Sequence, residues 1–178
     1  SGSERKKSSE RLYLRSTLPK GIRYSFEWIR AGPTFAGYYR DVRYCFGALR
    51  LPLSSHAQAR LYYRAYARNL DKSQSSNSAD RENQLTIGVS ANPYQHLGLG
   101  IDFDAFWRKD VLEQPSFDFT EHSMRIALSF TSEKWALNVG GEYGQYRDFL
   151  KATSRRLERY SASIFLRPSP GHSYSVYG

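Results

Sequence analysis

The chain has 178 residues, a formal net charge of +9 at pH 7 and a mean hydropathy of −0.64. Its length suits one domain, and the single cysteine, Cys45, excludes an internal disulfide framework. No stretch approaches the roughly 20 consecutive apolar residues that a membrane-crossing helix needs, which excludes a helical membrane protein but not one that crosses with strands.

Ten β-strands are predicted after a polar segment, 1–9, that is expected to be disordered or a loop. The remaining residues, 10–178, are expected to form one β-barrel domain, complete or incomplete. The strands are predicted at 10–18, 22–31, 39–51, 57–69, 84–92, 97–108, 120–131, 135–147, 157–167 and 172–178. The evidence is a period of two, because successive side chains of a strand point to opposite faces.

Two of these strands mark the extremes of the pattern. The strand at 39–51 fits worst: Arg50 falls in phase with Tyr44 and Phe46, so a β-bulge is predicted near Gly47. The strand at 57–69 fits best, because an apolar set alternates with a cationic one. The apolar set is Ala57, Ala59, Leu61, Tyr63, Ala65 and Ala67, and the other is Gln58, Arg60, Tyr62, Arg64, Tyr66 and Arg68.

The strand at 97–108 carries the longest apolar stripe, from Leu97 to Trp107. At about 3.4 Å per residue and a tilt near 45°, this stripe spans about 25 Å, which matches the apolar band of an outer-membrane barrel. Soluble strands are typically only about 5–6 residues long. Aromatic residues near strand ends resemble two interfacial girdles: Trp28, Trp107, Tyr143 and Tyr160 on one side, Tyr94 and Trp135 on the other.

The predicted connections are short and long in turn, as in outer-membrane barrels. Short ones are expected at 19–21, 52–56, 92–96, 132–134 and 168–171, and long polar ones at 32–38, 70–83, 109–119 and 148–156. Because the first and last connections are both short, the chain is expected to be part of a larger barrel of about twelve or more strands.

The predicted fold is therefore all-β, an antiparallel up-and-down transmembrane β-barrel. A soluble β-barrel or β-sandwich that binds an anionic partner is the alternative, and it would need the apolar faces to point inward. The positive charge alone would suit nucleic acid. However, the arginines are spaced along strand faces and do not form a compact cluster, so no nucleic-acid partner is expected.

The polar faces of the strands supply the candidate binding residues of a water-filled lumen. Arginines in a pore favour anions, and tyrosines beside them offer stacking surfaces and hydrogen bonds for sugars. The alternative is that these arginines pair with carboxylates across the lumen, and both interpretations stay open. The candidates are Arg11, Arg15, Arg23, Arg60, Tyr62, Arg64, Tyr66, Arg68, Asp102, Asp104, Arg125, Glu142 and Arg159.

No catalytic constellation is predicted. His122 and Ser123 are adjacent in one strand, so they point to opposite faces and His122 cannot activate Ser123. Asp102 and Asp104 share a face, but the sequence offers too few further oxygen ligands for a calcium site, and they are expected to pair with arginines. Neither a metal nor a cofactor is expected, and the protein is not expected to be an enzyme.

Residues 95–107 and 163–177 resemble strands of bacterial outer-membrane β-barrels. More loosely, the rhythm of proline, short turn, long strand and bulky aromatic is similar to the C-terminal barrels of exopolysaccharide-export porins and of a phage-adsorption receptor. The resemblance implies a periplasmic partner region, and a polymer or a phage as cargo or ligand. It assigns no site residue.

These observations together predict an outer-membrane pore or translocation channel for anionic or sugar-rich substrates, with the lipid bilayer and other barrel strands or a periplasmic domain as partners. A surface receptor or adhesin that acts through its long loops is the alternative function. The bacterial outer membrane is the expected location. The mitochondrial outer membrane is the alternative, because 169–176 and 96–103 resemble a weak mitochondrial barrel signal.

Overall fold

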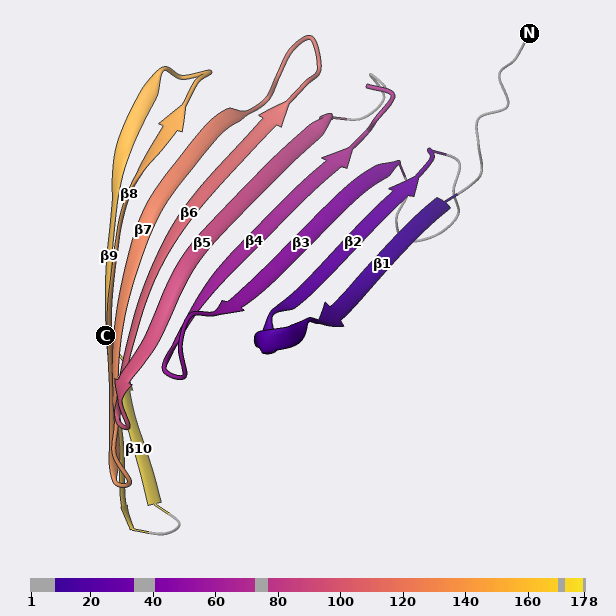
Figure 1. Ribbon diagram of the computed structural model, residues 1–178. Coiled ribbons are helices and arrows are strands. Elements are labelled where there is room, and N and C mark those ends of the chain that lie inside the picture. The colour runs from indigo at the N-terminus through magenta and orange to yellow at the C-terminus, as the bar shows by residue number, and fades with distance from the viewer. Residues whose placement is uncertain (1–8, 34–40, 73–76, 170–171, 178) are drawn as a thin grey trace, which may run out of the picture.

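The computed structural model describes residues 9–33, 41–72, 77–169 and 172–177, with side chains up to Leu166. Ten antiparallel strands form one sheet in chain order (Figure 1). A single turn of 3-10 helix, η1 (Pro19–Gly21), links the first two strands. The strands are β1 (Ser9–Thr17), β2 (Arg23–Ala31), β3 (Val42–Pro52), β4 (Ala57–Arg68), β5 (Asp80–Tyr94), β6 (Leu97–Asp110), β7 (Asp118–Thr131), β8 (Trp135–Asp148), β9 (Thr153–Ser169) and β10 (His172–Tyr177).

The prediction of ten strands in an all-β antiparallel meander is confirmed. The largest differences in bounds lie on the long-loop side, where β5 begins at Asp80 and β9 at Thr153. The connection predicted to be long at 148–156 is therefore only 149–152. Of the polar segment 1–9, residue Ser9 begins β1, and residues 1–8 lie outside the described part of the chain.

The bulge predicted near Gly47 is wrong. β3 pairs with β2 and with β4 without any shift of register, so Tyr44, Phe46 and Arg50 lie on one face of a regular strand. The pattern misled because these aromatic residues were assigned to the apolar face. Among the described residues, register shifts occur instead in β5 between Ala91 and Tyr94 and in β10 between His172 and Tyr174.

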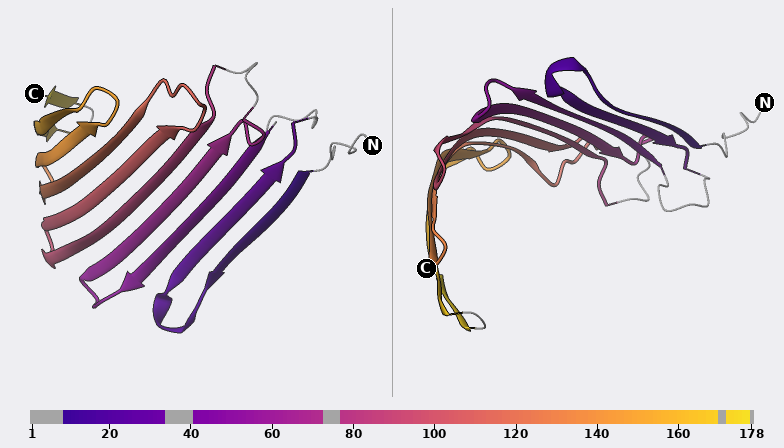
Figure 2. Two further views of the ribbon diagram at one scale, coloured as in Figure 1. Left: turned by 90° about the horizontal axis from the view of Figure 1, so that it is seen from above. Right: turned by 60° about the horizontal axis from the view of Figure 1, so that its bottom comes forward.

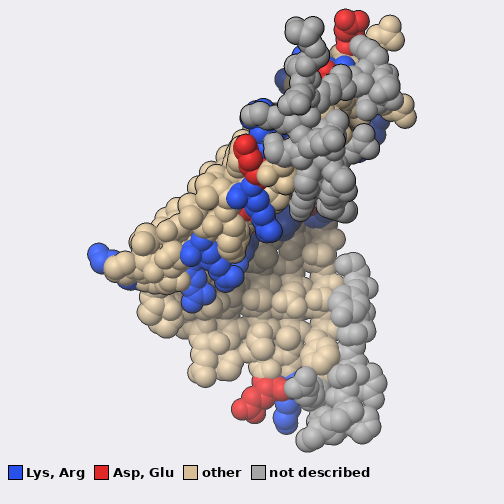
Figure 3. Space-filling view, turned by 90° about the vertical axis from the view of Figure 1, so that its right-hand side faces the viewer, with Lys and Arg blue, Asp and Glu red and all other residues tan. Residues whose placement is uncertain are grey.

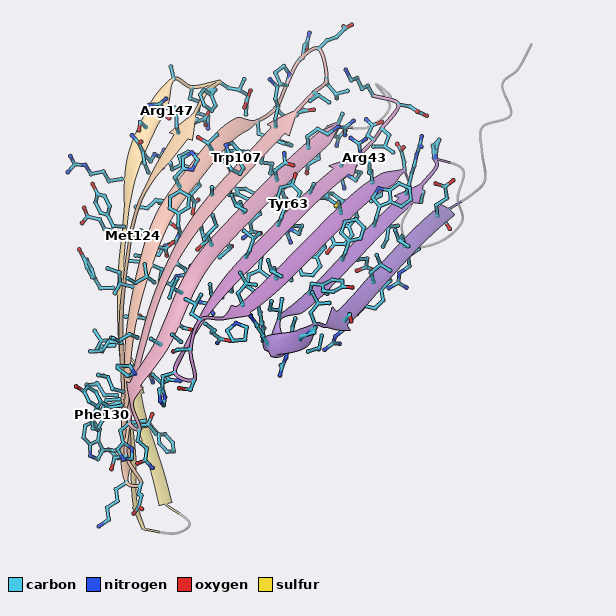
Figure 4. All side chains as sticks on the ribbon, viewed as in Figure 1. Arg43, Tyr63, Trp107, Met124, Phe130 and Arg147 are labelled. Atoms are coloured by element: carbon cyan, nitrogen blue, oxygen red, sulfur yellow. The ribbon has the colours of Figure 1, made fainter. Side chains whose placement is uncertain are left out.

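The register separates the side chains into two faces, because directly opposite residues of paired strands point the same way. Leu61 of β4, for example, lies opposite Leu49 of β3 and Ile87 of β5. The sheet is strongly curved (Figure 2). The side chains of Met124 and Phe130 project from its outer side (Figure 4). We call the face that carries them the convex apolar face and the opposite one the concave polar face.

No second layer among the described residues covers either face. Large apolar side chains of the convex face are therefore exposed: Leu99, Ile101 and Ile126 expose 44%, 53% and 49% of their surface. The buried apolar residues are few and mostly small, and they gather near the long-loop end: Ile29, Ala31, Val42, Ala67, Ala79 and Ala105. The described part of the chain therefore forms no enclosed hydrophobic core of the kind that a globular domain has.

The sheet is open and does not close into a barrel. Within the described ranges, β1 pairs only with β2, and β10 pairs only with β9. One edge of β1 and one edge of β10 are thus left without a neighbouring strand.

None of the helical turns in the described residues is long and apolar enough to cross a membrane.

Candidate functional site

All thirteen side chains predicted to line a lumen lie on the concave polar face, as the pairing of the strands places them. Seen from the side of β1, lysine and arginine gather in the upper and middle parts of the molecule, whereas much of the surface below them is uncharged (Figure 3). The alternation of the sequence predicted this face correctly. It did not predict which of its charges meet.

One row of directly opposite residues crosses the concave polar face. It contains five arginines, two carboxylates and one glycine, and we call it the charged row. From β2 to β9 its members are Arg23, Arg50, Arg60, Gly88, Asp102, Arg125, Glu142 and Arg159. Charges of opposite sign alternate over β6–β9, whereas β2–β4 contribute arginine only.

Gly88 joins the two halves of the charged row. Arg60 and Asp102 lie two strands apart, and they form a bidentate ion pair across the backbone of Gly88. A Cβ atom at this position would overlap the Asp102 carboxylate and lie 2.9 Å from Arg60 Nε. The absence of a side chain at Gly88 is therefore the condition for this ion pair.

Glu142 is the centre of a second group of charges. Its carboxylate accepts a hydrogen bond from Ser123 Oγ at 2.8 Å and lies 3.3 Å from Arg159 Nη1 and 3.7 Å from Arg125 Nη2. Arg125 also lies 3.9 Å from the carboxylate of Asp104. Glu142 is only 9% exposed, so its charge is held by these partners rather than by water.

Further arginines of this face are also paired. Arg11 contacts Glu27 at 2.7 Å, and Arg64 forms an ion pair with Glu82. The prediction that arginines pair with carboxylates across the polar face therefore holds for part of the set.

The other end of the concave polar face is different. Arg15, Arg23 and Arg50 have no carboxylate within ion-pair distance among the described residues. They border a depression of about 490 Å³, which we call the arginine pocket. Tyr24 also borders it, and its aromatic residues on the concave polar face are Tyr13, Phe46 and Tyr62. Sequence reasoning missed Arg50, Tyr13 and Phe46. Phe46 was missed because the sequence pattern assigned the aromatic residues of β3 to the apolar face.

Tyr62 orients one member of the arginine pocket. Arg50 donates to the Tyr62 hydroxyl oxygen from Nε at 3.2 Å and from Nη2 at 3.1 Å. Because that oxygen accepts both bonds, its own proton is left to donate elsewhere.

At the long-loop end, Asp110 organises the connections. It is 1% exposed, and its carboxylate accepts hydrogen bonds from the N–H groups of Ala79, Leu112 and Ser116 and from the Ser116 hydroxyl. Burial raises the pKa of Asp110, but these hydrogen bonds outweigh it and lower the pKa from 3.8 to about 2.

The residues considered for catalysis are separated as expected. His122 lies on the convex apolar face, with its ring 5.6 Å from Trp107 and 6.4 Å from Phe103. Ser123 lies on the opposite face, bound to Glu142. No group of three or more metal-ligating side chains occurs in the described part of the chain.

A scan of family models, a search of curated proteins and a search of solved structures each found no match to this chain.

Proposed function

We propose that the chain forms part of the wall of an outer-membrane β-barrel, whose convex apolar face contacts lipid and whose concave polar face lines an aqueous path for anionic or sugar-rich substrates. The bacterial outer membrane is the proposed location. The open edges of β1 and β10 would pair with further barrel strands, which would satisfy their free backbone groups in the membrane.

The observation that carries this proposal is that the concave face of the curved sheet is polar and its convex face is apolar. In a soluble β-barrel the concave face is apolar and forms the core, because burial of apolar surface drives folding. Here the concave face carries arginine and carboxylate, and the convex face carries exposed leucine, isoleucine and phenylalanine. A polar interior and an apolar exterior are the arrangement of transmembrane barrels.

Aromatic contacts on the convex apolar face support the same orientation. Near the short turns, Phe130 stacks on Trp135 at 4.9 Å and lies 6.2 Å from His96. Nearer the long loops, Trp107 packs against His122. Aromatic rings at both ends of an apolar band are typical of the two membrane interfaces.

The first test is whether the protein needs an amphiphile to fold. We expect the purified chain to give a monodisperse β-rich species in detergent or lipid vesicles and to aggregate in buffer alone, because its convex apolar face is uncovered. Circular dichroism with size-exclusion chromatography measures this. A monodisperse monomer in buffer would instead support the soluble alternative.

A matched pair of variants tests the assignment of the faces. Ile126 and Ala127 are neighbours in β7 and point to opposite faces. We expect Ile126→Arg to reduce the fraction that inserts into vesicles, since an arginine facing lipid costs about 2–4 kcal/mol near the bilayer centre. Ala127→Arg should insert like the unmodified protein. Equal insertion of the two variants would contradict the proposed orientation.

A further inference from the structure

The arginine pocket lies on the concave polar face of β1–β4, at the short-turn end of the sheet. It is defined by Arg15, Arg23 and Arg50, and the aromatic residues that border it on the concave polar face are Tyr13, Phe46 and Tyr62. Its volume of about 490 Å³ is within the usual range of small-molecule sites.

The three arginines of the pocket are close neighbours. Arg23 lies directly opposite Arg50, and Arg15 lies opposite Ser25, which makes it a diagonal neighbour of Arg23. Like charges placed directly opposite each other in a sheet are destabilising. The cluster is therefore unfavourable unless something offsets its charge.

Nearby carboxylates do not offset it. The closest ones in the sheet are taken: Glu27 pairs with Arg11, and Asp102 pairs with Arg60. The adjoining Arg11 and Arg60 thus have carboxylate partners, whereas the arginines of the pocket have none among the described side chains. An anion from solution would complete the site.

The donors are suited to a tetrahedral oxyanion. Arginine presents a planar fork that binds phosphate through two parallel hydrogen bonds. Arg50 is already held by the Tyr62 hydroxyl, which reduces the freedom that binding would remove. The proton of that hydroxyl is an additional donor on the same side.

The aromatic residues indicate what kind of molecule the anionic group belongs to. Tyr13, Phe46 and Tyr62 border the same depression as the guanidinium groups. Aromatic faces pack against the C–H surfaces of a ring, and tyrosine adds a hydroxyl for hydrogen bonding. An inorganic ion would leave these surfaces unused.

We propose that the arginine pocket binds a sugar phosphate, with the phosphate between the three guanidinium groups and the sugar ring on the tyrosine and phenylalanine side chains. This inference deepens the proposed function, because it names a substrate class and the place on the concave polar face that binds it. The role of the bound sugar phosphate as cargo rests on that proposed function.

The test is isothermal titration calorimetry of the protein in non-ionic detergent with glucose 6-phosphate, glucose, glucose 6-sulfate and inorganic phosphate. We expect glucose 6-phosphate to bind most tightly and glucose to bind at least tenfold more weakly. Glucose 6-sulfate, with less charge, should bind between them, and inorganic phosphate more weakly than glucose 6-phosphate. This ranking is measured on the unmodified protein, so it does not depend on whether any variant folds.

Variants then locate the site. Arg50→Gln and Arg23→Gln should each weaken binding of glucose 6-phosphate about tenfold, the loss expected for one charge-assisted contact. Arg50→Lys, which keeps the charge but loses the fork, should weaken it less than Arg50→Gln. Arg155→Gln is the control: it removes one arginine from the same face in β9, outside the pocket, and should change affinity less than twofold.

The outcomes separate this inference from the proposed function. A protein that needs detergent but binds no glucose 6-phosphate, or loses as much affinity in Arg155→Gln as in Arg50→Gln, overturns the pocket and leaves the membrane proposal standing. Equal affinity for glucose and glucose 6-phosphate also overturns it. A protein that is monomeric in buffer and binds glucose 6-phosphate in this ranking supports the pocket and overturns the membrane proposal.

Discussion

Gly88 shows how one missing side chain lets charges from two non-adjacent strands form an ion pair. It is buried between Arg60 and Asp102, whose ion pair passes over it. In β4 and β6 the sequence alternation puts both charges on the same face, but they belong to strands that are not adjacent. Only a glycine in the intervening strand lets them meet.

We expect Gly88→Ala to break this ion pair, because the new Cβ would displace the Asp102 carboxylate. Leaving two partly buried charges without partners should lower the free energy of unfolding by about 1–3 kcal/mol. Urea unfolding in detergent measures the change.

Gly100→Ala is the matched control, on the same face of the neighbouring strand. Its Cβ would make an ordinary contact, 3.9 Å from Ala127 Cβ, so the free energy of unfolding should change by less than about 0.5 kcal/mol. Equal effects of the two substitutions would mean that the ion pair adds no stability.

At the scale of elements, the long connections are held by Asp110 at the end of β6. Its carboxylate reaches both the preceding long loop, at Ala79, and its own loop, at Leu112 and Ser116. A backbone hydrogen bond also joins the two loops, since Val111 N–H donates to Ala79 C=O at 3.0 Å. Two loops that are separate in sequence thus form one structural unit at the rim.

This arrangement should depend on pH. The pKa of Asp110 is lowered from 3.8 to about 2 in the folded protein, so its stabilisation is complete above pH 3.8 and is lost as the pH falls towards 2. The shift corresponds to about 2 kcal/mol.

We expect Asp110→Asn to remove this stabilisation at neutral pH and to speed amide hydrogen exchange at Ala79, Leu112 and Ser116. The control is Asp118→Asn: this half-buried carboxylate contacts the exposed side chain of Lys109 at 3.3 Å, and its replacement should have little effect on exchange at these amides. Unchanged exchange in Asp110→Asn would show that the loops do not need this carboxylate.

At the scale of the whole molecule, the proposed pore makes a prediction: net charge on the concave polar face should set its ion selectivity. Replacing Arg60, Arg64 and Arg68 together with Gln should shift the preference towards cations. Arg60 and Arg64 now neutralise Asp102 and Glu82, so their removal also leaves two carboxylates unpaired on this face.

The measurement is the reversal potential in planar bilayers that hold the protein under a salt gradient. The matched control replaces Arg30, Arg43 and Arg147, which lie on the opposite face of the sheet near the long loops. An unchanged reversal potential in the first triple variant would contradict a substrate path along this face.

The sequence by itself determined the strands and the side to which each side chain points. Alternation is a local property, so the ten strands of the meander and the shared face of Arg60, Asp102 and Glu142 could be predicted from residue order alone. It failed in β3, where aromatic residues share a face with Arg50 and hydrophobicity does not distinguish the two faces.

The tertiary structure alone decided which charges pair and which stay free. Pairing depends on register, which relates residues far apart in the chain, and no local pattern specifies it. Register sets Gly88 between Arg60 and Asp102, and it brings Arg23 opposite Arg50 with no carboxylate of the described residues paired to either. The curvature of the sheet likewise arises from all of its strands together, and it made the polar face the concave one.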